Sequence, residues 1–133
     1  MTANTPRSRK AKGRKFQQEI RDIFRQLFKD ELEPDDINCT MMSESGMDIK
    51  LTPAARKLVP FDLECKRQEK LSIHESLKQA EENSLPNRIP AVIFSRNHSK
   101  TYIVMEFNKF LHLVYPERIK NLSNIPESVP VVE

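Results

Sequence analysis

The pattern of apolar and polar positions in the first half of the chain predicts one helix followed by three short strands. From Lys15 to about Glu31, apolar residues recur at steps of three and four, which is typical of an amphipathic helix. The apolar residues of this helix are Phe16, Ile20, Ile23, Phe24, Leu27 and Phe28. The strands are predicted at Ile37 to Met41, Met47 to Leu51 and Val59 to Cys65. They are separated by turn-prone residues at Ser43 to Gly46 and at Thr52-Pro53.

The second half of the chain is also predicted to contain helices and strands. A second helix is predicted from about Ser72 to Asn83, with Ser72 as its N-cap. Two apolar runs, Ile89 to Ser95 and Thr101 to Met105, flank a polar turn and predict a hairpin. A last short helix is predicted from Asn108 to Val114. The order α-β-β-β-α-β-β-α predicts an α/β fold in which helices flank a mixed sheet and bury both of its faces.

Length and composition predict one compact domain with two tails. A chain of 133 residues is large enough for one core and short for two. Residues 1–12 are polar and basic without an apolar period, so we expect a disordered arm there. We expect the domain itself to span residues 13–115. Residues 116–133, which contain several prolines, are expected to form an irregular tail.

Composition also narrows the cellular setting. With 38% hydrophobic and 31% charged residues, the sequence has no apolar run near the roughly 18 residues that span a bilayer. No membrane association is therefore expected, and the N-terminus lacks the apolar stretch of a secretory signal. Cys39 and Cys65 lack the spacing of a zinc site and are expected to be reduced. These features favour a cytoplasmic protein, in the host cytoplasm if it is encoded by a phage.

Positive charge is concentrated near the N-terminus. The net charge is only +3, but six basic residues precede the first acidic one, and the rest of the chain is acidic on balance. These basic residues are Arg7, Arg9, Lys10, Lys12, Arg14 and Lys15. Such a segment suits DNA binding, because each Lys or Arg that neutralises a phosphate releases counterions. The alternative is a solvated tail that only aids solubility.

Two predicted strands place acidic and basic residues on their polar sides. Side chains alternate along a strand, so Asp48 lies opposite the apolar residues of its strand, and Asp62, Glu64 and Lys66 share one side of the next. If the strands pair, two carboxylates and a lysine converge, and Mg²⁺ would relieve the repulsion between the carboxylates. Lys66 could then act on the attacking water or offset charge on the phosphorane. The alternative is a set of ordinary cross-strand pairs facing solvent.

This arrangement resembles the PD-(D/E)xK nuclease superfamily, in particular its Holliday-junction resolvase-like branch and small phage-encoded nucleases of that type. The matching motifs are Lys12-Gly13-Arg14, Gly46-Met47-Asp48, Glu64-Cys65-Lys66 and Gln79-Ala80. The resemblance implies a restriction-endonuclease-like α-β-β-β-α-β core. It also implies that Asp48, Glu64 and the backbone carbonyl of Cys65 bind Mg²⁺, for which Mn²⁺ would substitute. Lys66 would be catalytic, with Gln79 nearby.

One position departs from the family pattern. Resolvases of this branch carry a glutamate four residues after the glycine of the first motif, and here that position is Gln17. Glu19 follows two residues later and lies on the opposite margin of the apolar stripe, so only one of the two can face the site. Both stay candidate site residues. Ser45, beside the second motif, and Arg96, in the hairpin turn, are candidate DNA contacts.

The sequence thus predicts a metal-dependent DNA endonuclease. Branched or junction DNA is the expected substrate, and cutting two strands symmetrically would require a homodimer. Two alternatives stay open. One is a homing or restriction-like nuclease with the same chemistry. The other is a nucleic-acid-binding module that kept the fold and lost catalysis, which the glutamine in place of the helix glutamate favours.

Overall fold

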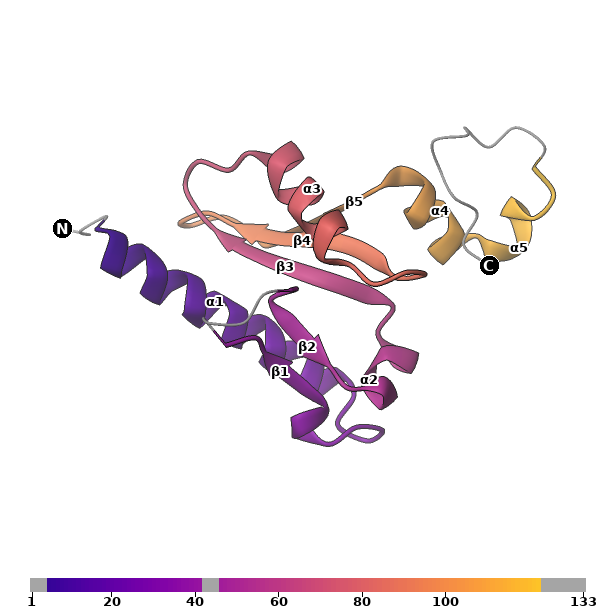
Figure 1. Cartoon of the computed structure of the whole chain (residues 1–133), viewed down its shortest axis with the longest axis horizontal. Coiled ribbons are helices and arrows are strands. Elements are labelled where there is room, and N and C mark those ends of the chain that lie inside the picture. Colours follow the sequence, from indigo (N-terminus) through magenta and orange to yellow (C-terminus); the bar gives the residue numbers. More distant parts are fainter. Residues whose placement is uncertain (1–4, 42–45, 123–133) are drawn as a thin grey trace.

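The protein is an α/β structure in which a long helix and a short one cover opposite faces of a small sheet. The computed structural model describes residues 5–41 and 46–122. In chain order, its elements are α1 (Pro6–Leu27), η1 (Pro34–Asp36), β1 (Ile37–Cys39), β2 (Ile49–Leu51), α2 (Pro53–Leu58), β3 (Phe61–Arg67), α3 (Ile73–Asn83), β4 (Ile89–Ser95), β5 (Tyr102–Met105), α4 (Phe107–Val114) and α5 (Pro116–Ile119). The predicted restriction-endonuclease-like order α-β-β-β-α-β is confirmed, with η1 and α2 as additions (Figure 1).

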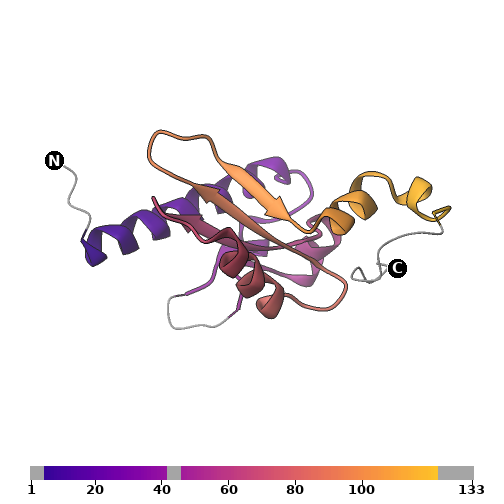
Figure 2. The ribbon, with the colours of Figure 1, turned by 90° about the horizontal axis from the view of Figure 1, so that it is seen from above.

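The central sheet contains three strands in the order β3-β4-β5. β3 and β4 are parallel and are connected by α3, whereas β4 and β5 form the predicted antiparallel hairpin. β1 and β2 form a separate antiparallel pair. This pair adjoins β3, because the N–H of Asp48 donates to the carbonyl of Leu63 at 3.0 Å. Helix α3 lies on one face of the sheet, and α1 and the β1–β2 pair lie on the other (Figures 1 and 2).

The main core lies between β3, β4, the β1–β2 pair and α1. Its buried residues are Phe16, Ile20, Ile37, Ile49, Leu51, Ala55, Val59, Leu63, Cys65, Ala91 and Ile93. Burying each large apolar side chain contributes about 2 kcal/mol, so this cluster fixes α1 firmly against β3. On the opposite face, α3 buries Ser76 and Ala80. Asp62 and Glu64 of β3 are buried as well, so the strand is enclosed on both sides.

Helix α1 begins earlier than its apolar pattern predicts. It starts at Pro6 instead of Lys15, so residues 6–12 of the expected disordered arm are helical. The reason is local: the side chain of Thr5 caps the helix by accepting from the N–H of Ser8 at 3.1 Å, and proline is favoured in the first turn. Lys, Arg and Ala are also good helix formers, although they produce no apolar period.

The buried side of α1 is also narrower than predicted. Ile23 and Leu27, which belong to the predicted apolar stripe, are 54% and 65% exposed and so lie outside the buried side of the helix. The contacts with the core come from Phe16, Ile20 and the partly buried Phe24. These residues are spaced four apart and form one row along a helix, from which Ile23 and Leu27 are displaced.

Two short helices replace segments that were expected to be irregular. Thr52 and Pro53 were interpreted as a turn, but the hydroxyl of Thr52 accepts from the N–H of Ala55 at 3.3 Å and caps α2. α5 begins at Pro116, inside the expected irregular tail. The remainder of that tail, residues 123–133, lies outside the described residues. Within residues 5–41 and 46–122, no helix has the length and apolar character needed to cross a bilayer.

Candidate active site

Asp48 is held against β3 by both its backbone and its side chain. Its N–H donates to Leu63, and its Oδ2 accepts from the N–H of Cys65 at 2.7 Å. Directly after β1, the N–H of Thr40 donates to the carbonyl of Asp48 at 2.9 Å, and the Thr40 hydroxyl donates to the carbonyl of Met47. These bonds fix Asp48, just before β2, beside the strand that carries Glu64, Cys65 and Lys66.

Glu64 is the most enclosed acid of the site, with 1% of its surface exposed. Its Oε1 accepts from the side-chain amide of Asn83 on α3 at 3.0 Å, and the carboxylate of Asp48 is its neighbour. Burial, followed by repulsion from Asp48, raises the pKa of Glu64 to about 7. The bond from Asn83 and the charge of Lys66 oppose this rise without cancelling it. At neutral pH the pair of carboxylates is therefore poised to accept a compensating cation.

Asp48 lines an open groove of about 910 Å³, and Glu64 is its buried neighbour. The walls of the groove come from the N-terminal half of α1, the end of β3 with the following loop, and the β4–β5 turn. The lining residues are Arg9, Lys10, Lys12, Gly13, Gln17, Asp48, Cys65, Lys66, Arg67, Gln68, Glu69, Lys70 and Asn97. Six of these are basic and two acidic, so the groove favours an anionic occupant. Lys66, half-buried, lies in this groove beside Asp48.

The residues around Asp48 and Glu64 fit a divalent metal ion that is bound by only a few protein ligands. Asp48 and Glu64 supply adjacent carboxylates, which are ligands that Mg²⁺ prefers. Burial raises the pKa of the Cys65 thiol, so this side chain is neutral and only its backbone is suited to a hard ion. Among residues 5–41 and 46–122 there is no cluster of three or more His, Cys, Asp or Glu side chains that could hold a metal. Water would complete the coordination.

The structure separates the two candidate residues on α1. Gln17 lines the groove together with Asp48, whereas Glu19 lines a smaller hollow of about 230 Å³ with Lys12, Lys15, Phe16 and Arg67. The residue of α1 that shares the groove with Asp48 is therefore the amide and not the acid. An amide oxygen is a weaker ligand for a hard cation than a carboxylate, so Asp48 and its neighbour Glu64 remain the two acidic candidate ligands.

Helix α3 contributes a different residue from the one expected. Gln79 is exposed and lines neither the groove nor the smaller hollow. Asn83, one turn later on the same helix, makes the hydrogen bond to Glu64. The sequence contained the signal for this, since Ser72, Ser76, Gln79 and Asn83 form one polar ridge. Spacing alone could not tell which member of the ridge faces β3.

Only some of the candidate DNA contacts line the groove. Arg9, Lys10 and Lys12 line the groove, whereas Arg7, Arg14 and Arg96 do not. Lys15 lines only the smaller hollow, and Ser45 lies outside the described residues.

Four further groove residues were missed by sequence reasoning. They are Arg67, Gln68, Glu69 and Lys70. The β4–β5 turn is attached to the β3–α3 loop, because Asn97 accepts from Arg67 at 3.2 Å and its N–H donates to Glu69 at 2.9 Å. A run of polar residues directly after the Glu64-Cys65-Lys66 motif was the available signal.

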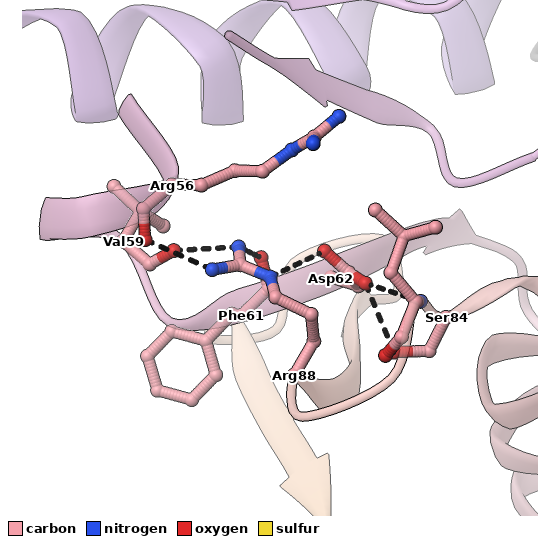
Figure 3. Close-up of polar contacts among 7 residues, drawn as sticks. Arg56, Val59, Phe61, Asp62, Ser84 and Arg88 are labelled. Carbon is pink, nitrogen blue, oxygen red and sulfur yellow. Dashed lines mark hydrogen bonds and ion pairs between the residues drawn. The ribbon is translucent and has the colours of Figure 1, made fainter. Parts of the chain in front are cut away.

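Asp62 lies on the same side of β3 as Glu64 but belongs to a different arrangement. Arg88 forms an ion pair with it at 3.1 Å, and the Ser84 hydroxyl and the Leu85 N–H each donate to it at 2.9 Å (Figure 3). The guanidinium of Arg88 also donates to the carbonyls of Arg56, Val59 and Phe61. Asp62 is thus fully paired, so its partners tie the start of β3 to the loop before β4 and leave no ligand for a metal.

Comparison with known families agrees with the geometry of the site. Residues 8–125 match the family model described as "phage putative PDDEXK endonuclease". The chain belongs to this family. No curated protein and no solved structure matches it. The family supports a nuclease, and nucleases of the PD-(D/E)xK kind generally use divalent metal ions.

Proposed function

We propose that this family member is a Mg²⁺-dependent endonuclease that hydrolyses phosphodiester bonds of DNA in the groove between α1 and the end of β3. The observation that carries the proposal is the buried Glu64 next to the half-buried Asp48, at a groove whose charged residues are mostly basic. Two adjacent carboxylates, one of them buried, cost stability unless something compensates their charge, and a divalent cation does so. The phosphate backbone of DNA is the anionic ligand that the basic walls would attract.

Each residue of the centre has a distinct proposed role. Asp48 and Glu64, with the backbone carbonyl of Cys65, would hold the metal ion. A bound Mg²⁺ would polarise the scissile phosphate and acidify a water molecule. Lys66 reaches the groove beside Asp48 and would bind the attacking water or the phosphate oxygens that gain charge. Gln17 would hydrogen-bond to the phosphate or to a metal-bound water, since its amide lacks the charge of the usual glutamate.

The substrate and assembly are part of the same proposal. We propose branched or junction DNA as the preferred substrate and the host cytoplasm as the setting. The part of the chain that the structure describes offers one such centre, so the symmetric cutting of a junction would require a homodimer. Mn²⁺ would replace Mg²⁺, because it accepts the same oxygen ligands.

A cleavage assay tests the proposal directly. Supercoiled plasmid and a synthetic four-way junction are incubated with the protein in Mg²⁺, in Mn²⁺ or in EDTA. We expect cleavage only with a metal ion, and a loss of about 10³-fold or more in the single-turnover rate in Glu64→Gln and Lys66→Ala. Lys57→Ala is the matched control, because Lys57 is an exposed lysine on α2 that does not line the groove. Sedimentation of the protein bound to the junction measures the oligomeric state.

The second candidate function is a DNA-binding module without catalysis, favoured by Gln17 as the residue of the family's glutamate position that lines the groove with Asp48. Binding of the junction without cleavage in either metal ion, unchanged in Glu64→Gln, would establish it and refute the nuclease. The variant Gln17→Glu sharpens this choice. If the missing acid is the defect, this substitution should produce or increase cleavage, whereas in an active wild type it should mainly tighten metal binding.

A further inference from the structure

Glycine occurs only twice in the chain, and only one of the two is explained by the fold. Gly46 has φ +112°, a conformation that other residues rarely adopt. Gly13 instead lies inside α1, where glycine is the least favourable residue after proline. A Cβ added at Gly13 would meet nothing within 4 Å. Neither the backbone nor a neighbouring atom of the described residues therefore requires glycine at this position.

The surroundings of Gly13 indicate another reason. It lines the groove, as do Arg9 and Gln17, one helical turn before and after it. These three residues form one row on the side of α1 that faces the groove. Because the middle member has no side chain, the helix backbone is bare between a cation and an amide.

We propose that Gly13 is the point at which the sugar–phosphate backbone of the substrate packs directly against α1. This inference rests on the proposed function. The ligand class follows from the surrounding charge: Arg9 and Lys12 flank the bare position, and Lys66 and Arg67 line the groove as well. The lining residues of the described groove include no aromatic side chain on which a base could stack. Contact at Gly13 is therefore with the backbone of the nucleic acid and is independent of its sequence.

The proposal predicts opposite effects on folding and on binding. Gly13→Ala should raise Tm by about 3 °C, because alanine favours the helix and the added methyl group meets open space. The same methyl group occupies the space of the ligand, so the Kd for DNA should rise about tenfold, and about a hundredfold in Gly13→Leu. Affinity is measured with a fluorescein-labelled duplex and a labelled four-way junction in Ca²⁺ buffer, each with two unrelated base sequences.

Ala11→Leu is the matched control for added bulk. Ala11 is exposed on the same helix and does not line the groove, so its substitution should leave Kd unchanged. Wild-type affinity in Gly13→Leu would overturn the inference while leaving the nuclease proposal intact. A lower Tm in Gly13→Ala would also overturn it, because glycine would then serve the fold. Wild-type protein that neither binds nor cleaves any of these DNAs would refute both proposals.

Discussion

Asp62 and Glu64 are two residues apart on one side of β3, and they show two different ways to bury a carboxylate. They are 3% and 1% exposed. Asp62 faces Arg88 and two further donors, so its charge is compensated within the chain. Glu64 faces Asp48 and one amide, and its pKa rises to about 7. The difference teaches that burial alone does not mark a functional acid. A functional acid is marked instead by the group that faces it, because a carboxylate that faces another carboxylate needs a ligand from outside the chain.

The largest expected effect that would sharpen this comparison comes from Arg88→Met. It removes the cation and leaves the charge of Asp62 buried, which should lower the free energy of unfolding by about 3–5 kcal/mol in a urea titration. Cleavage at low temperature should persist, since Arg88 does not line the groove. The double variant Asp62→Asn/Arg88→Met removes both charges and should recover part of the loss. An inactive but fully stable Arg88→Met would break the distinction between the two acids.

The next effect is the pH dependence of stability in EDTA. Glu64 has a folded-state pKa of about 7, above its ordinary value of 4.5. The folded state therefore binds a proton more tightly than the unfolded state, and this stabilisation is fully present below about pH 4.5 and lost as pH rises through about 7. The loss should be on the order of 3 kcal/mol. Glu64→Gln should remove this part of the pH profile, and an unchanged profile would contradict the assigned burial.

The same titration gives a prediction for the metal-bound protein. A divalent ion binds the ionised carboxylates, so added Mg²⁺ should stabilise wild type most at high pH and should stabilise Glu64→Gln little.

The smallest effect is expected at Asn83. Its amide donates to Glu64 and favours the ionised form, so Asn83→Ala should weaken Mn²⁺ binding about tenfold in a calorimetric titration. Gln79→Ala is the control, because Gln79 is exposed on the same helix. Equal metal affinities in the two variants would show that Asn83 does not orient the glutamate.

Local pattern was sufficient to predict most of the elements. The limits of β4 at Ile89 and Ser95 agree with the predicted strand, and Ser72 caps α3 as expected. These features depend on neighbours along the chain. The approach of Asp48 to Glu64 was also predictable from the alternation of side chains along two adjacent strands.

Features set by distant contacts were not predictable. Asp62 and Glu64 have the same parity on β3, and only the fold brings Arg88 to one and Asp48 to the other. The choice of Asn83 over Gln79 depends on how α3 lies on the sheet. The helical state of residues 6–12 was hidden for a different reason, because good helix formers without apolar residues leave no periodic signal.

The positions of α1 and α5 have a practical consequence for experiments on this chain. In both views, the first turns of α1 and the helix α5 lie at opposite ends of the described structure (Figures 1 and 2). A fluorophore or surface tether attached at Lys120, next to α5, would leave the mouth of the groove open to large DNA molecules. The same attachment at Arg7 would lie beside the basic entrance and would distort every measurement of affinity.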